Sequence, residues 1–337
     1  MRIAVINCKD SENMTELDRK IDNYMAHAHH PQLNSILVWE NGEMLAERYY
    51  NGYDSESRHQ IKSVVKSILS IAVGIAADDG LLSIDDPIGK YIPEFAENRD
   101  VLHRKITVRH LLTMSSGIFW QGGVHYTCPL TDGMRRSRQW VDFIADCKVV
   151  NIPGAKHLYK EWDVILLAVI LSKVSGDCYD FIDNRIYKPL GITSERWYKS
   201  PDGAYYSVAF DEEKEKQSNL SAKDMLKLGI LFMQDGMWNG KRIVSKEYIE
   251  QATKPSPQAA HYGFLWWVGT DYYDMRGLEG KPPVLTAKTG DWYACRGFGG
   301  QTVTVFKESG RIVVTQATVT NRPLDYSDVI FDVALDT

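Results

Sequence analysis

Hydrophobic and polar positions along the chain form a pattern that predicts strands near both ends and helices in the middle. Residues 15–29 carry apolar side chains at helical spacing behind Thr15, a suitable N-cap, and predict an amphipathic helix. Two β-type runs follow over 35–49, and Asn41-Gly42 between them is typical of a two-residue hairpin turn. Further predicted strands occupy 263–269, 283–288, 302–306 and 311–320, and a short helix is predicted over 326–335.

The middle of the chain has helical periodicity, and its segments begin or end at recognisable capping and stop residues. The predicted helices span 60–77, 107–117, 137–147, 162–174, 179–190 and 221–234. This order predicts an α+β fold in which one antiparallel β-sheet is flanked by helices. We expect residues 1–80 and 255–337 to form the sheet domain and 81–254 to form a helical subdomain inserted between its two parts. The functional site is expected at their interface.

The predicted helix over 60–77 is apolar around nearly its whole circumference, which is typical of a buried helix. It is too short, and too often interrupted by polar residues, to span a membrane. Ser63 and Lys66 stand near its start as the only S-x-x-K of the chain. Because they are three positions apart, their side chains project from the same helix face.

A serine hydroxyl next to a lysine amine is a nucleophile next to a base. If Lys66 emerges from a buried helix, desolvation lowers the affinity of its amine for a proton, and the amine then accepts the proton of Ser63. The alternative is an ordinary surface lysine at the solvated end of the helix. The motif alone leaves both interpretations open.

Composition describes a globular chain of 337 residues, long enough for one large core or for two cores that share an interface. A net charge of −5 and a sequence pI of about 6.0 argue against a nucleic acid or an anionic membrane as the main partner. The N-terminal apolar run is too short for a signal peptide, so we expect a cytoplasmic protein.

The pattern of cysteines and histidines predicts no metal. The five cysteines are scattered without a C-x-x-C pair, which favours neither a disulfide framework nor a zinc site. His27, His29 and His30 have no cysteine or carboxylate close by, and we favour a solvated helix end over a metal site there. We therefore predict neither a metal nor a cofactor.

Four further segments accompany the S-x-x-K in a recognisable order: 110–118, Pro153-Gly154 followed by Tyr159, 287–290 with Lys-Thr-Gly, and 297–301. Together they resemble the serine β-lactamase-like hydrolases, specifically the class C β-lactamase branch with its penicillin-binding-protein, esterase and 6-aminohexanoate-dimer hydrolase relatives. The resemblance covers residues 35–320. It implies the β-lactamase/transpeptidase-like form of the α+β fold.

The resemblance also implies a role for each matching residue. Ser63 would be the acylated nucleophile, and Lys66 the amine that helps take its proton. Tyr159 would shuttle that proton to the leaving group as a phenolate between two lysines, whereas outside the motif an aromatic at the start of a core helix is the favoured interpretation. Lys288 would face Ser63 from a strand edge and supply positive charge, whereas by itself it is typical of a surface lysine before a turn.

The remainder of the Lys-Thr-Gly segment would complete the implied site. Thr289 and Gly290 would lie on the substrate-binding edge. The backbone N–H groups of Ser63, at a helix N-terminus, and of Asp291, on the edge strand, would form the oxyanion hole.

Glu161 is a departure from the family pattern, because the Y-x-N motif has asparagine at its position. An ionised carboxylate only accepts hydrogen bonds, so binding of a penicillin's amide side chain is less well supported. We expect Glu161 instead to pair with Lys66 or to recognise a basic substrate. The absence of an export signal is a second departure, since it does not suit defence against antibiotics in the periplasm.

The third departure is the spacing between Lys-Thr-Gly and Gly297, where six residues, 291–296, replace the three of the class C pattern. We favour a longer hairpin that adds Trp292 and Tyr293 to the wall of the site. The alternative is a slipped register in which Asp291, Trp292 and Tyr293 occupy the place of the triad.

The sequence therefore predicts a cofactor-independent serine hydrolase that cleaves a small-molecule ester, amide or β-lactam through an acyl-Ser63 intermediate. The fold by itself does not choose among these substrates. The alternative is a catalytically weak penicillin-binding or sensing protein on the same fold, because Glu161 alters the proton relay.

Overall fold

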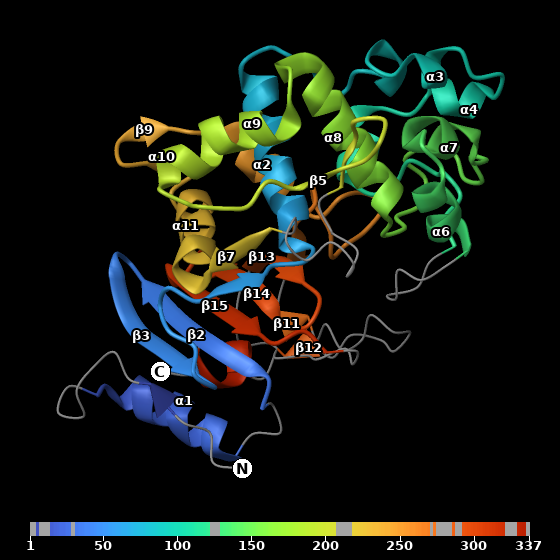
Figure 1. Cartoon of the computed structure of the whole chain (residues 1–337). Helices are drawn as coiled ribbons and strands as arrows, with labels where there is room; N and C mark the ends of the chain where they lie inside the picture. The colour runs from blue at the N-terminus through green and yellow to red at the C-terminus, as the bar shows by residue number, and fades with distance from the viewer. Residues whose placement is uncertain are drawn as a thin grey trace.

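The computed structural model has at its centre a β-sheet with helices on both faces (Figure 1). Seven strands form it in the order β1-β3-β2-β15-β14-β13-β10, and each neighbouring pair is antiparallel. Because β2 pairs with β15, segments from opposite ends of the chain close one sheet. The predicted α+β class is thereby confirmed. The residues that the structure describes are 5–6, 14–27, 31–121, 129–206, 218–269, 272–273, 285–286, 292–320 and 329–334.

The strands of this sheet alternate side chains between its two covered faces. The turn between β2 and β3 is the predicted hairpin, because Asn41 and Gly42 have φ of +48° and +102°, the left-handed backbone that such a turn requires. The seven strands are β1 Val5–Ile6, β2 Leu33–Glu40, β3 Glu43–Tyr50, β10 Trp267–Gly269, β13 Trp292–Gly297, β14 Gln301–Phe306 and β15 Arg311–Ala317.

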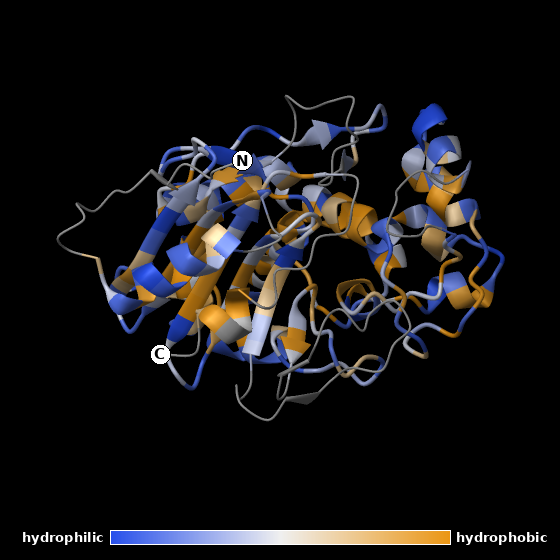
Figure 2. Ribbon diagram, turned by 90° about the horizontal axis from the view of Figure 1, so that it is seen from below, coloured by the Kyte–Doolittle hydropathy of each residue, from blue (hydrophilic) through white to orange (hydrophobic). Residues whose placement is uncertain are grey.

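Two hydrophobic clusters hold the helices to the sheet. On one face, α1 (Glu16–His27) and the π-helical turn Val329–Val333 pack against the strands. On the other face lies the larger cluster, with α11 (Ala222–Met233) on the strands and α8 (Glu161–Ser175) against α2 (Val64–Asp78). Figure 2 shows hydrophobic residues along the central strands and along the helices that flank them.

Short helices and two-stranded ribbons complete the helical part and its edges. The helices are the 3₁₀ turn Ile88–Lys90, α3 Pro93–Ala96, α4 Val101–Arg104, α5 Val108–Leu112, α6 Pro129–Arg136, α7 Trp140–Asp146, α9 Cys178–Ile182, the π-helical turn Asp183–Tyr187, α10 Lys188–Leu190 and α12 Lys246–Ala252. The ribbons pair β4 Arg58–Gln60 with β7 Asn219–Ser221, β5 Tyr198–Lys199 with β6 Tyr205–Tyr206, β8 Met237–Trp238 with β9 Lys241–Arg242, and β11 Tyr272–Tyr273 with β12 Leu285–Thr286.

Backbone conformation explains where elements are shorter than predicted. The helix predicted over 107–117 ends at Leu112, because Met114 adopts a φ of +53° that an α-helix does not tolerate. Likewise, Leu265 has a φ of +60°, so only Trp267–Gly269 of the predicted strand 263–269 joins the sheet. Within the described residues, no helix is both long and apolar enough to cross a membrane.

Candidate active site

Ser63 occupies the N-cap of α2, directly behind a residue in the left-handed region. Lys62 has a φ of +49°, and the first helical hydrogen bonds run from the N–H groups of Val64, Val65 and Lys66 to carbonyls at 61, 62 and 63. The Ser63 side chain does not cap its own helix. Its Oγ instead accepts a hydrogen bond of 3.0 Å from Lys66 Nζ. The two residues of the S-x-x-K therefore meet as their spacing predicts.

Gly297, at the end of β13, allows the sheet to approach this turn closely. A Cβ atom at this position would lie 2.1 Å from the carbonyl oxygen of Ile61, two residues before Ser63. No side chain fits at that distance. The glycine of the 297–301 motif thus sets the packing of the sheet against the start of α2.

Lys66 forms a buried ion pair with Glu161, the first residue of α8. Nζ lies 2.8 Å from Glu161 Oε1, and both side chains are 1% exposed. Burial by itself lowers the pKa of Lys66, as the sequence argument expected. However, the neighbouring Glu161 carboxylate and Tyr159 phenol outweigh burial, so the pKa is raised above its ordinary value. Lys66 is therefore an ammonium at neutral pH, and the expected neutral amine is corrected.

Tyr159 lies beside this pair, with Lys66 Nζ 5.2 Å from the centroid of its ring. Trp267 stacks on the ring at 5.9 Å, and Tyr262 meets it edge-on at 6.1 Å. Burial raises the pKa of Tyr159 and Glu161 adds to the rise, while Lys66 and Ser63 oppose it. Among the described groups, the phenol therefore holds its proton at neutral pH. The second lysine of the expected phenolate, Lys288, lies outside the described residues, so that expectation stays a prediction.

A second buried ion pair, which the sequence analysis did not select, anchors the same segment. Lys160 Nζ lies 3.3 Å from Asp163 Oδ2, and these side chains are 1% and 0% exposed. Asp163 Oδ1 also accepts a hydrogen bond of 2.6 Å from Ser116 Oγ. Trp162 Nε1 donates to the carbonyl of Phe119 at 3.1 Å. The start of α8 is thus held against the 110–118 segment and the residue that follows it. In the sequence, the lysine and the acid three positions apart could have predicted this ion pair.

The motif residues 110–118 and 153–159 pack directly against each other. Leu158 N–H donates to the Met114 carbonyl at 2.8 Å. Gly154 has a φ of +84°, and a Cβ there would lie 2.8 Å from His110 Nε2, so glycine fits this contact. These two segments position Tyr159 relative to α2.

Trp292 and Tyr293, which the sequence predicted in the wall of the site, lie in a strand of the central sheet. Trp292 and Tyr293 belong to β13 and are 2% and 5% exposed. Because side chains alternate along a strand, Trp292 packs in the α1-side cluster and Tyr293 in the cluster on the opposite face. Trp292 therefore faces away from α2, and its expected place in the site wall is wrong, whereas Tyr293 lies on the same face as α2. The length and register of the hairpin before Trp292 stay predictions. Lys288, Thr289, Gly290 and Asp291 lie outside the described residues.

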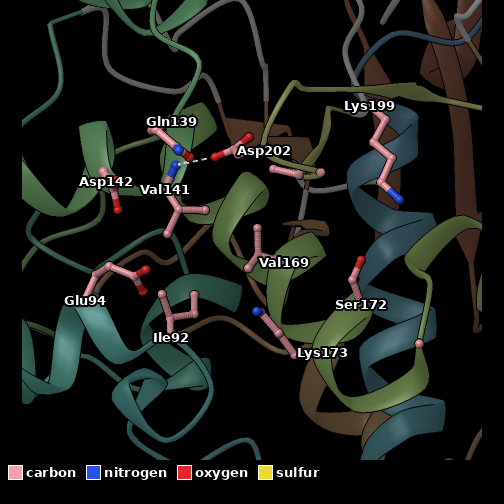
Figure 3. Close-up of a pocket in the computed structure, with 13 residues that line it drawn as sticks. Ile92, Glu94, Gln139, Val141, Asp142, Val169, Ser172, Lys173, Lys199 and Asp202 are labelled. Carbon is pink, nitrogen blue, oxygen red and sulfur yellow. Dashed lines mark hydrogen bonds between the residues drawn. The ribbon is translucent and has the colours of Figure 1, made fainter.

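The described residues contain no cluster of His, Cys, Asp or Glu that could hold a metal ion. His29 and His30 are not among them. A cavity of about 350 Å³ opens at the far end of α8 from Glu161, beside Val169, Ser172 and Lys173 (Figure 3). Its lining includes neither Ser63 nor the residues that contact it, so this cavity is separate from the candidate active site.

Comparisons with known proteins agree with this architecture. The model of the Beta-lactamase family matches residues 17–334. Putative penicillin-binding protein PbpX of Bacillus subtilis is 26% identical over 80% of this chain and 71% of its own. A putative beta-lactamase of Bacteroides dorei superposes with a TM-score of 0.71, at 18% identity, over 94% of this chain and 96% of its own. A putative 6-aminohexanoate-dimer hydrolase of Bacillus anthracis does so with a TM-score of 0.66, at 19% identity, over 95% and 81%. The chain therefore belongs to the Beta-lactamase family.

Proposed function

We propose that the protein is a serine hydrolase in which Ser63 carries the acyl group of a small-molecule ester, amide or β-lactam. One observation carries the proposal: the hydroxyl of Ser63 is hydrogen-bonded at 3.0 Å to an amine that a buried carboxylate holds in place. A serine oriented by a lysine at a helix N-terminus is an arrangement suited to nucleophilic acyl transfer. Family membership supports the hydrolase class.

The reaction divides into acylation and deacylation. Ser63 Oγ attacks the carbonyl carbon and gives up its proton, the C–O or C–N bond to the leaving group breaks, and the leaving group departs with a proton. The phenol of Tyr159, beside Lys66, is the proposed donor of that proton. The proton lost by Ser63 restores the group that protonated the leaving group. Water then attacks the acyl-Ser63 ester by the reverse route. The backbone N–H of Ser63, at the positive end of α2, is proposed to stabilise the oxyanion.

A second candidate function, penicillin binding with slow turnover, has its own supporting observation. The ion pair with Glu161 keeps Lys66 protonated, which slows any step that requires a free amine. The relative PbpX is named a putative penicillin-binding protein. In this case acylation occurs but the acyl group remains on Ser63.

Covalent labelling tests both candidates. The protein is incubated with a fluorophosphonate or a fluorescent penicillin, and the adduct is located by peptide mass; we expect it on Ser63 and expect the Ser63→Ala variant to stay unlabelled. Labelling at another residue, or none with either probe, would reject the proposal. Turnover of nitrocefin, short-chain nitrophenyl esters and small amides then ranks the substrates. A persistent penicillin adduct without turnover favours the second candidate.

A further inference from the structure

Glu161 is enclosed among groups of the candidate active site. Both of its carboxylate oxygens are inaccessible to solvent, so this side chain does not meet a basic substrate in the described structure. The groups that face it are Lys66 from α2, Tyr159 from the preceding segment and Tyr262 from the loop before β10. Among the described residues, no donor other than Lys66 contacts its oxygens. Its charge is held by one ammonium and by its place in the first turn of α8.

Attack by Ser63 requires a proton acceptor, and its immediate neighbours are already protonated. Among the described groups, the pKa values of Lys66 and Tyr159 are both raised, so both side chains hold their protons at neutral pH. These are the titratable side chains that contact Ser63 among the described residues. The next group along the contact chain is Glu161, where the distances are 3.0 Å from Oγ to Nζ and 2.8 Å from Nζ to Oε1. The first contact is a hydrogen bond, and the second is an ion-pair contact that is short enough for a proton to cross once an Nζ–H turns toward Oε1.

We propose that Glu161, acting through Lys66, receives the proton of Ser63 during acylation. This inference rests on the proposed function. The Oγ–H proton moves to Nζ while one Nζ–H proton moves to Oε1, and the Oγ–C bond forms. Lys66 remains an ammonium, Glu161 becomes a neutral acid, and its negative charge reappears on the oxyanion, so charge and protons balance.

The proton then returns as the tetrahedral intermediate collapses. Glu161 gives it back to Lys66, which relays a proton to Tyr159 as the phenol gives its own to the leaving group. Lys66 and Glu161 are again an ion pair when the acyl-enzyme forms, ready for the attack of water. A carboxylate at this position therefore lets Lys66 serve in the relay without ever being a free amine.

The pH dependence of the wild-type protein distinguishes this route from a free-amine or phenolate base. We measure kcat/KM for p-nitrophenyl acetate, whose leaving group needs no proton, from pH 5 to 10. The proposed route predicts a level profile from about pH 6 to 9, because neither a neutral amine nor a phenolate has to form before Ser63 attacks. If the base were instead an amine or a phenol whose raised pKa lies above this range, it would have to lose a proton first. In that case kcat/KM would rise tenfold per pH unit. That rise would overturn the inference.

The Glu161→Gln variant supplies the second arm. It keeps the shape of the side chain and removes the proton acceptor, so activity then requires a neutral Lys66. We expect kcat/KM of this variant to rise with pH across the range, because Lys66 must now lose a proton before it accepts the one from Ser63. Glu161→Asp, which retains a carboxylate, is expected to keep the level profile. A level profile in Glu161→Gln would contradict the inference.

Asp163→Asn is the matched control, because Asp163 is an equally buried acid on the same helix, paired with Lys160 instead of Lys66. A merely structural effect of losing a buried acid predicts the same change of profile in both variants. Fluorophosphonate labelling distinguishes failure of the proposed serine hydrolase function from failure of the proposed role of Glu161. If the wild type is not labelled at Ser63, the proposed function fails; if it is labelled but the profiles do not differ, only the role of Glu161 fails.

Discussion

At the scale of single residues, Lys66 holds its proton because Glu161 and Tyr159 raise its pKa by more than burial lowers it. An S-x-x-K at the start of an apolar helix was sufficient to predict that Ser63 and Lys66 face each other, and the structure gives a hydrogen bond between them. The sequence also offered Lys66 as a partner of Glu161. It did not give the outcome of that pairing, because burial and the carboxylate shift the lysine's pKa in opposite directions and their balance depends on distance.

Tyr159 is the residue whose role in proton transfer is easiest to isolate. Replacing Tyr159 with Phe removes the hydroxyl and retains the stacking on Trp267. We expect kcat for a small amide, whose leaving group needs a proton, to fall by about 10²-fold or more. The loss with p-nitrophenyl acetate should be smaller, because nitrophenolate departs unprotonated.

Tyr262→Phe is the matched control for this experiment, since Tyr262 packs edge-on against the same ring. Its loss of activity should be similar for both substrates. If Tyr159→Phe retains wild-type amide turnover, Tyr159 is not part of the proton relay.

At the scale of elements, local signals predicted those parts of the fold that local sequence determines. The Asn41-Gly42 hairpin and the helix that begins at the Ser221 N-cap fall where the sequence places them. Residues 291–296 were instead predicted only as the lengthened part of a hairpin. The strand β13 over 292–297 was not predicted, because its pairing with β10 and β14 is long-range. Conformations such as the φ of +60° at Leu265 are likewise imposed by tertiary packing.

The buried ion pair between Lys160 and Asp163 stabilises the start of α8, and a single substitution removes one of its two charges. Asp163→Asn leaves the ammonium of Lys160 buried without its counter-charge and weakens the bond from Ser116. We expect the free energy of unfolding to fall by about 3 kcal/mol or more, measured by urea denaturation at pH 7. Glu250→Gln, in an exposed pair with Lys246, should change it by less than about 1 kcal/mol. A similar small change for Asp163→Asn would refute a structural role for the pair.

At the scale of the whole molecule, buried histidines couple stability to pH. Burial lowers the pKa of His59 and of His157 to about 4, whereas both titrate near 6.5 in the unfolded chain. Above pH 6.5 both states are neutral and nothing is lost. As the pH falls from 6.5 to 4, only the unfolded state takes up these protons, so the folded state loses stability across that window.

Thermal unfolding between pH 7 and pH 4 measures this coupling. We expect Tm to fall through the window and to fall less in His59→Phe, because phenylalanine retains the stacking on Tyr53 and does not titrate. The Tm of each protein is expressed relative to its own value at pH 7. Parallel curves for the two proteins would show that His59 does not contribute to the acid sensitivity.

The pairing of β2 with β15 has a consequence for folding during synthesis. β2, an interior strand of the sheet, acquires its second neighbour only after residues 311–317 have left the ribosome, more than 270 residues after β2 itself. Until then, the hairpin of β2 and β3 presents an unpaired edge, which is a site of strand-to-strand aggregation. Nascent or truncated chains that stop before β14 and β15 therefore need a chaperone, or some other cover for that edge, more than the completed protein does.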